Sequence, residues 1–152
     1  MADTVSFEEA LARTGTLVYT NKGVSMMPLL REDRDLMVIA RRGAERCKKY
    51  DAVLFCRPGV EGRGAYVLHR VLRVNDDGTY WIVGDNCASG ETVREENVLG
   101  ILTAVVRDGR TIPVTNWTYR LYVRLWCAPW PLRFALKRAR ALAARLWHRW
   151  KG

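Results

Sequence analysis

The chain has 152 residues, of which 49% are hydrophobic and 27% charged. This composition is typical of one globular domain and excludes a disordered or fibrous protein. The longest stretch without a charged residue runs from Asn97 to Val106, whereas a transmembrane helix needs about 20 mostly apolar residues. Residues 1–9 carry three acids and no apolar segment, which is unlike a secretory signal. We therefore expect a cytoplasmic protein with no signal peptide and no transmembrane helix.

The net charge of +9 is unevenly distributed along the chain. Residues 1–108 contain 15 Lys and Arg against all 16 Asp and Glu, whereas residues 109–152 contain ten basic residues and no acid. Such a block of positive charge indicates contact with an anionic surface, either lipid headgroups or nucleic acid.

The first two thirds of the chain predict a β-rich domain. Ser6, followed by two glutamates, predicts a capped helix over 6–13. Segments rich in β-branched and aliphatic residues then predict strands over 17–20, 36–40, 52–56, 66–74, 79–83, 99–106 and 111–114. Two Asp-Gly pairs, at 77–78 and 108–109, are hairpin turn signals. Short strands at close spacing favour a compact barrel or sandwich.

The pattern changes at Trp117. From there apolar residues recur at steps of three and four, which predicts helices, and two prolines at 129 and 131 divide them into a short and a longer helix. We therefore expect a β domain over 1–116 and a basic, aromatic helical tail over 117–152.

The cysteines show no pattern of a disulfide framework or a metal site. They have no C-x-x-C spacing and no histidine at a metal-binding distance in the sequence, and a disulfide framework is unexpected in a cytosolic chain of this size. We interpret Cys47, Cys56, Cys87 and Cys127 as reduced structural thiols and expect no metal and no cofactor.

Ser25 is a candidate nucleophile. It lies between Gly23 and Pro28, and a sharp turn of this kind displays a serine while nearby backbone N–H groups face an oxyanion. The alternative is an ordinary turn serine, because short motifs also match by chance.

His69 is the only histidine outside the tail. Strand alternation places it with Val67 and Val71 on one face. An apolar surrounding disfavours the charged imidazole, which suits a general base near neutral pH. The alternative is a core histidine bonded to a backbone carbonyl.

Two acids are candidates for orienting His69. Asp85 lies in Gly84-Asp85-Asn86, and Glu91 follows shortly after. An acid beside an imidazole fixes its tautomer and stabilises the imidazolium, although Gly-Asp-Asn is also good turn chemistry in its own right.

Together and in this order, these segments resemble the motifs of the type I signal peptidase family, whose fold and serine motif also occur in LexA-like self-cleaving repressors. The resemblance covers residues 17–106. The matching segments are Gly23-Val24-Ser25-Met26-Met27-Pro28, Tyr50-Asp51-Ala52-Val53-Leu54-Phe55, Val67-Leu68-His69-Arg70-Val71, Gly84-Asp85-Asn86 and Val98-Leu99-Gly100. It implies a mainly β, LexA- and signal-peptidase-like fold with a short N-terminal helix and C-terminal amphipathic helices.

The resemblance also implies roles for single residues. Ser25 matches the nucleophile, and His69 stands where most bacterial members have a lysine, as in the histidine-using endoplasmic-reticulum and SipW-like subgroup. Either Asp85 or Glu91 would orient the imidazole. The oxyanion and substrate-binding turn would include Gly23, Met26 and Pro28. Two features depart from the family: Gly23 replaces a common serine, and no N-terminal membrane anchor is apparent.

These implications predict a serine endopeptidase that cleaves a peptide or preprotein by Ser–His acyl transfer at or near the cytoplasmic membrane. The substrate would lie extended along a sheet edge. The alternative is a catalytically inactive or self-cleaving LexA-like member that serves as a membrane-surface or partner-binding module.

The tail predicts a peripheral, in-plane contact with an anionic membrane, because aromatic and basic residues without acids suit the bilayer interface. Packing of the helices on the β domain is the alternative, above all for residues 117–130. Nucleic acid is not expected, since only about twenty residues precede the serine motif and leave no room for a DNA-reading domain. The residues expected at the membrane are Trp126, Trp130, Arg133, Lys137, Trp147 and Trp150.

Overall fold

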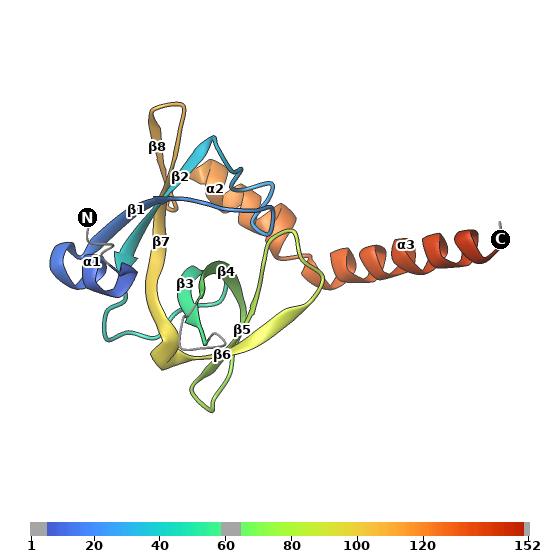
Figure 1. Cartoon of the computed structure of the whole chain (residues 1–152), viewed down its shortest axis with the longest axis horizontal. Helices are drawn as coiled ribbons and strands as arrows, with labels where there is room; N and C mark the ends of the chain where they lie inside the picture. The colour runs from blue at the N-terminus through green and yellow to red at the C-terminus, as the bar shows by residue number, and fades with distance from the viewer. Residues whose placement is uncertain (1–5, 59–64, 151–152) are drawn as a thin grey trace.

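The computed structural model describes residues 6–58 and 65–150 (Figure 1). Its architecture confirms the predicted class: one antiparallel sheet of eight strands, a short N-terminal helix and C-terminal helices. The elements are α1 (Phe7–Thr14), β1 (Thr16–Thr20), β2 (Asp35–Arg41), β3 (Ala52–Arg57), β4 (Ala65–Val74), β5 (Thr79–Val83), β6 (Gly90–Arg94), η2 (Glu95–Asn97), β7 (Val98–Arg107), β8 (Arg110–Pro113), α2 (Trp117–Tyr122), η3 (Val123–Cys127) and α3 (Trp130–Trp150).

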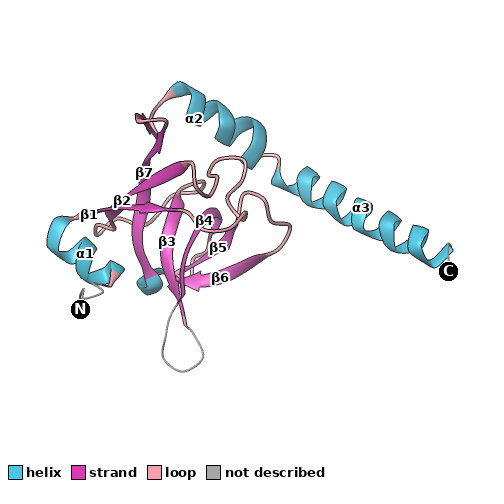
Figure 2. Ribbon diagram, turned by 45° about the horizontal axis from the view of Figure 1, so that its top comes forward, coloured by secondary structure: helices cyan, strands magenta, loops and turns pink. Residues whose placement is uncertain are grey.

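The strands follow the order β1-β2-β7-β3-β4-β5-β6, and β8 pairs with β7 outside this path. The sheet is strongly curled, as Figures 1 and 2 show. Residues 65–69 of β4 pair with β3 alone, whereas from Arg70 onward the strand also pairs with β5. Among the described residues, β1 pairs only with β2. One edge of β1 and one edge of residues 65–69 of β4 therefore have no partner among the described strands.

The seven predicted strands are all present, with ends that differ by at most one residue. The sequence prediction missed β6. Its five residues bury only Val93, so the segment lacks the apolar alternation by which a strand is recognised.

The N-terminal helix forms as predicted. The Ser6 side chain accepts a hydrogen bond from the Glu9 N–H at 3.1 Å, and Gly15 ends the helix with a left-handed φ of 73°, the usual role of glycine after a helix. Leu11 is buried and attaches the helix to the sheet.

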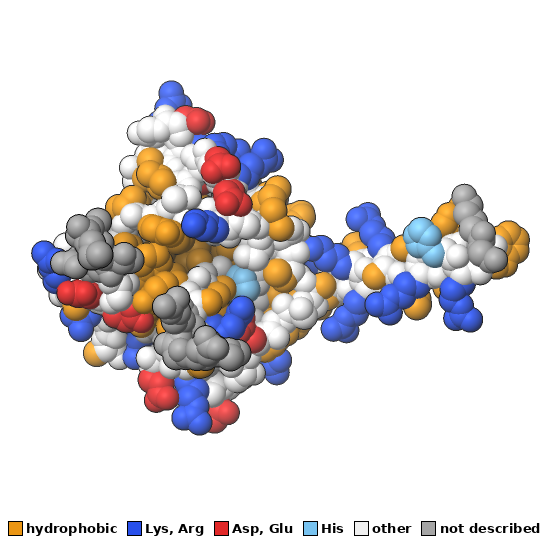
Figure 3. Space-filling model, viewed as in Figure 1, with side chains coloured by type: hydrophobic (Ala, Val, Ile, Leu, Met, Phe, Trp, Pro, Cys, Tyr) orange, Lys and Arg blue, Asp and Glu red, His pale blue; other side chains and the backbone are white. Residues whose placement is uncertain are grey.

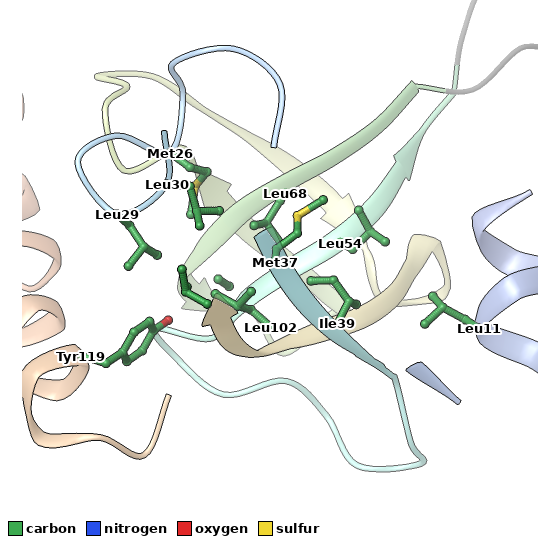
Figure 4. Close-up of a cluster of buried hydrophobic side chains, with 12 residues drawn as sticks. Leu11, Met26, Leu29, Leu30, Met37, Ile39, Leu54, Leu68, Leu102 and Tyr119 are labelled. Atoms are coloured by element: carbon green, nitrogen blue, oxygen red, sulfur yellow. The ribbon is translucent and has the colours of Figure 1, made fainter. Parts of the chain in front are cut away.

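The main core includes residues of the predicted serine turn. Met26 and Leu30 are fully buried and pack with Met37, Leu54 and Leu68 of three strands (Figure 4). Burying a Met or Leu side chain stabilises a fold by about 1.5–3 kcal/mol. The turn that displays Ser25 is therefore held by the core on its inner side.

The tail forms the two predicted helical parts, joined by the π-helical turn η3. The first turns of α3 contact the β domain through Trp130 and Phe134, whose rings lie 5.0 and 6.1 Å from that of Trp81. Beyond Lys137 every described residue of α3 is exposed, and the helix projects away from the sheet (Figures 1 and 2). None of the described helices is long and apolar enough to cross a membrane.

Candidate active site

Ser25 lies in a tight turn between β1 and β2. The Met27 N–H donates to the Val24 carbonyl at 3.1 Å, and the Leu30 N–H donates to the Met26 carbonyl at 2.9 Å. Ser25 itself is half-buried, whereas Met26 on its C-terminal side is fully buried. The turn thus leaves the hydroxyl at the surface while its neighbour anchors the backbone.

The backbone of this turn suits a glycine at position 23. Gly23 has a φ of 79°, a left-handed conformation that L-residues adopt at a cost. The Ser25 N–H donates to no other described residue, and Ser25 lines a cleft, so this N–H is available to an oxyanion. Met26, by contrast, is fully buried.

A second loop holds the serine turn in place. The Asn86 N–H donates to the Ser25 carbonyl at 2.8 Å, and the Asn86 side-chain amide donates to the Val24 carbonyl at 3.1 Å. Gly84 allows the close approach: an added Cβ would lie 2.7 Å from the Ser25 carbonyl oxygen and 3.0 Å from His69 Nε2. The Gly84-Asp85-Asn86 segment therefore supports the serine turn.

His69 on β4 presents its two ring nitrogens to different partners. Nε2 lies 3.0 Å from the position of a Cβ added at Gly84, a position that is 2.7 Å from the Ser25 carbonyl oxygen, and Nδ1 lies 3.7 Å from Glu91 Oε1. The side chain is 12% exposed. Burial lowers the pKa of His69 below its ordinary value, while the Glu91 charge raises it and the Arg57 charge lowers it. The neutral, proton-accepting form is thus favoured, in the direction that the sequence predicts.

Ser25 and His69 line the same cleft, although no hydrogen bond joins their side chains in the described structure. Catalytic hydrogen bonds are often long in a protein without substrate and shorten in the complex. Ser25 and His69, the candidate nucleophile and base, therefore share a cleft but are not hydrogen-bonded to each other.

Of the two candidate acids, the structure places Glu91 beside the imidazole. Glu91 lies on β6, and Arg57 donates to both of its oxygens: Nη2 to Oε1, the oxygen nearest His69, and Nε to Oε2 at 2.9 Å. Arg57 was not predicted from the sequence, because nothing in its local pattern distinguishes it from an ordinary basic residue at the end of a strand.

Asp85, the other candidate acid, is bonded to Arg70 instead. Both of its carboxylate oxygens accept hydrogen bonds at 2.7 Å from Arg70, whose side chain is fully buried. The Tyr122 hydroxyl donates to the same carboxylate at 2.7 Å. Burial, followed by the charge of Asp85, raises the pKa of Tyr122 well above its usual range. Asp85 is therefore fully engaged with Arg70 and the C-terminal helices.

The cleft has a volume of about 480 Å³. It lies between the open edges of β1 and β4, with Ser25 and His69 on its wall and the buried side chains of Met37 and Leu54 at its floor. Figure 3 shows the hollow and the hydrophobic side chains gathered around it. One end is aromatic: the Phe7 ring lies 4.7 Å from that of Tyr19 and 4.4 Å from that of Tyr66.

Gly23, Met26 and Pro28, which we expected in the oxyanion and substrate-binding turn, are not among the residues that line this cleft. Met26 is buried in the core, and Pro28 lines a separate small cavity beside Tyr119 and Tyr122. Their place in the site is limited to the backbone of the serine turn.

Four of the residues expected at the membrane contact the β domain instead. Trp126 Nε1 donates to the Asp85 carbonyl at 3.1 Å, and Arg133 donates to the same oxygen. Lys137 donates to the Asn86 carbonyl, and Trp130 packs on Trp81. Trp147 and Trp150 lie on the projecting part of α3, where they are 60% and 88% exposed. A membrane contact therefore stays a prediction only for Trp147 and Trp150.

Cys87 also lies on the wall of the cleft. Its sulfur would be 2.8 Å from a Cβ added at Gly84, the same position that His69 Nε2 approaches. The four cysteines are free, as predicted, but only the fold reveals that one of them adjoins the candidate base.

Comparison with known proteins gives no assignment for this chain. No family model matches the sequence, and no curated protein matches it. The function is therefore inferred from the geometry of Ser25, His69 and Glu91 and from the sequence motifs.

The space at Gly84 predicts the effect of a single methyl group. In Gly84→Ala, the added Cβ must displace the Ser25 carbonyl or the imidazole, at a stability cost of about 1–3 kcal/mol. A displacement near 1 Å lowers a catalysed rate by roughly 10²-fold. The rate at which a serine probe modifies Ser25 will measure this loss. Gly43→Ala is the matched control, because its Cβ meets nothing within 4 Å. Equal modification rates in the two variants would contradict this description of the site.

The buried ion pair predicts a loss of stability. Arg70→Met leaves the Asp85 carboxylate buried without its cation, which costs about 3–5 kcal/mol of unfolding free energy. Chemical denaturation will measure this loss. Arg94→Met removes an exposed partner of Glu96 and should change stability little. A small effect of Arg70→Met would mean that the pair does not hold the fold.

Proposed function

We propose that this protein is a serine endopeptidase in which Ser25 is the nucleophile, His69 the general base and Glu91 the orienting acid. One observation carries the proposal: Ser25 and His69 line one cleft, and the two ring nitrogens of His69 have different neighbours, Gly84 beside the serine turn for Nε2 and Glu91 for Nδ1. This division of the ring nitrogens is what a Ser–His–acid mechanism requires. The resemblance of the ordered motifs to signal peptidases supports the same assignment.

The proposed reaction is acyl transfer. Ser25 Oγ attacks the peptide carbonyl while His69 Nε2 accepts the hydroxyl proton, and His69 then returns that proton to the leaving amine. Water hydrolyses the acyl-enzyme by the same route, with His69 again as base. The free N–H group of Ser25 would stabilise the oxyanion, where one such donor contributes about 3 kcal/mol.

The open strand edges support an extended peptide as substrate. Main-chain groups of β1 and of residues 65–69 of β4 face the cleft with no partner among the described strands on that side. A peptide that adds a strand gains main-chain hydrogen bonds from such edges. Cleavage of an extended segment of a peptide or preprotein follows from this shape.

We further propose that the enzyme works at an anionic membrane surface. The docked face of α3 carries Trp130, Phe134 and Lys137, and an apolar stripe runs along the other side of the helix. The stripe residues are between 51% and 88% exposed: Leu132, Leu136, Leu142, Leu146 and Trp150. Arginines flank the stripe, and residues 109–152 contain no acid. This arrangement is typical of a helix that lies in the plane of a bilayer.

The proposed base predicts the pH dependence of Ser25 modification. Because burial lowers the pKa of His69 below 6.5, labelling by a β-lactam-type or fluorophosphonate probe should rise through a midpoint below pH 6.5 and stay level above pH 7. Ser25→Ala and His69→Ala should abolish it. Labelling that is independent of His69 would contradict the mechanism, and a folded wild type that takes neither probe would favour a binding module.

Glu91 predicts a shift of that midpoint. In Glu91→Gln, the charge that raises the pKa of His69 is lost, so the midpoint moves to still lower pH while the plateau rate falls. Glu96→Gln, which changes an exposed acid of η2, serves as the control. A midpoint that stays in place in Glu91→Gln would assign the orienting role to another group.

The membrane proposal predicts binding to vesicles that depends on lipid charge. The protein should sediment with vesicles of 30% phosphatidylglycerol in phosphatidylcholine, but weakly with phosphatidylcholine alone. Each arginine near such a surface contributes about 1 kcal/mol, so replacing Arg140 and Arg145 by Gln should weaken binding about 30-fold. Replacing Arg31 and Arg94 of the β domain by Gln is the control. Equal binding to both vesicles would sink the proposal.

A further inference from the structure

We propose that Lys137 and Arg133 of α3 are positioning residues for the nucleophile, because they hold the loop that holds the Ser25 turn. The inference rests on the proposed role of Ser25 and extends it to a part of the chain far away in the sequence. It assigns to α3 a function inside the active site in addition to any contact with a membrane.

The first step is the contact of α3 with the loop. Lys137 Nζ donates to the Asn86 carbonyl and, at 3.2 Å, to the side-chain Oδ1 of Asn86. Arg133 donates to the carbonyl of the preceding residue, Asp85, which also accepts from Trp126 Nε1 at 3.1 Å. Neither basic side chain forms an ion pair with any described residue. Both cations are therefore used on uncharged oxygens of one loop.

The second step leads from the loop to the nucleophile. Asn86 donates its backbone N–H to the Ser25 carbonyl at 2.8 Å and its side-chain amide to the Val24 carbonyl at 3.1 Å. An amide can donate only through its nitrogen and accept only through its oxygen. Because the Lys137 ammonium requires the oxygen, it fixes the amide with its NH₂ group turned toward Val24. Lys137 thus determines how Asn86 grips the turn.

The third step is that the base of α3 is itself fixed. The Phe134 ring is buried and lies 5.3 Å from the ring of Trp130 and 6.1 Å from that of Trp81. The Arg133 guanidinium stacks 5.0 Å from the Trp126 ring centre. This packing holds the helix without Lys137, so loss of the ammonium should loosen the loop and leave the fold intact.

A test compares Lys137→Met with Arg138→Met, which removes the same charge from the next, exposed residue of α3. The first readout is the maximal rate of Ser25 modification by the fluorophosphonate at saturating probe. We expect a roughly tenfold lower rate in Lys137→Met, an unchanged rate in Arg138→Met and partial recovery in Lys137→Arg. The pH midpoint should stay in place in all of them, because no group beside His69 changes.

The second readout does not require catalysis. Hydrogen exchange of the Asn86 amide reports its bond to the Ser25 carbonyl, and we expect roughly tenfold faster exchange in Lys137→Met than in Arg138→Met. Equal labelling rates in the two variants overturn the positioning role, and equal exchange overturns the mechanical link. If the wild type takes no probe, the proposed function fails and the catalytic statement falls with it. The exchange result still decides whether Lys137 holds the turn.

Discussion

The site depends on one buried ion pair. Arg70 follows His69 directly on β4, and Asp85 directly precedes Asn86, which grips the Ser25 turn. A bidentate pair between Arg70 and Asp85 therefore links the segments that carry His69 and Ser25, the proposed base and nucleophile, although neither partner has a role in the proposed chemistry. Since a buried charge without its partner is costly, the two segments cannot move apart without a large loss of stability. The remaining Arg70 nitrogen donates to the Tyr50 carbonyl, which ties a third segment to the same point.

The same pair explains why two acids near each other in the sequence have different roles. Asp85 is 2% exposed and receives hydrogen bonds from a buried guanidinium and from the C-terminal helices. Glu91 is partly exposed and shares its carboxylate between Arg57 and the His69 ring. A fully satisfied buried carboxylate has no capacity left for an imidazole. The different environments therefore give the two acids different roles: Asp85 stabilises the fold, and Glu91 faces His69, the proposed base.

Residue patterns predict this fold where burial is periodic along one segment. The strands, the capped α1 and the division of the tail followed from such patterns, whereas the expectation that Ser25 and His69 share one site came from the order of the motifs. Three features did not. The strand β6 is nearly all polar, and the partner of Asp85 is a basic residue on another strand. The sequence of α3 does not show which of its two faces packs on the β domain. Each is decided by contacts between segments, and local residue patterns carry no information about such contacts.

The open edge of residues 65–69 of β4 would limit which proteins the proposed enzyme could cleave. A segment that lies against residues 65–69 must present its own backbone groups in an extended form, so it cannot keep helical or sheet structure of its own. Compact partners would react only as fast as they expose such a segment. Terminal tails and linkers between domains would be the preferred targets, whatever their side chains. Discrimination among proteins would then begin with local unfolding rather than with recognition of a sequence.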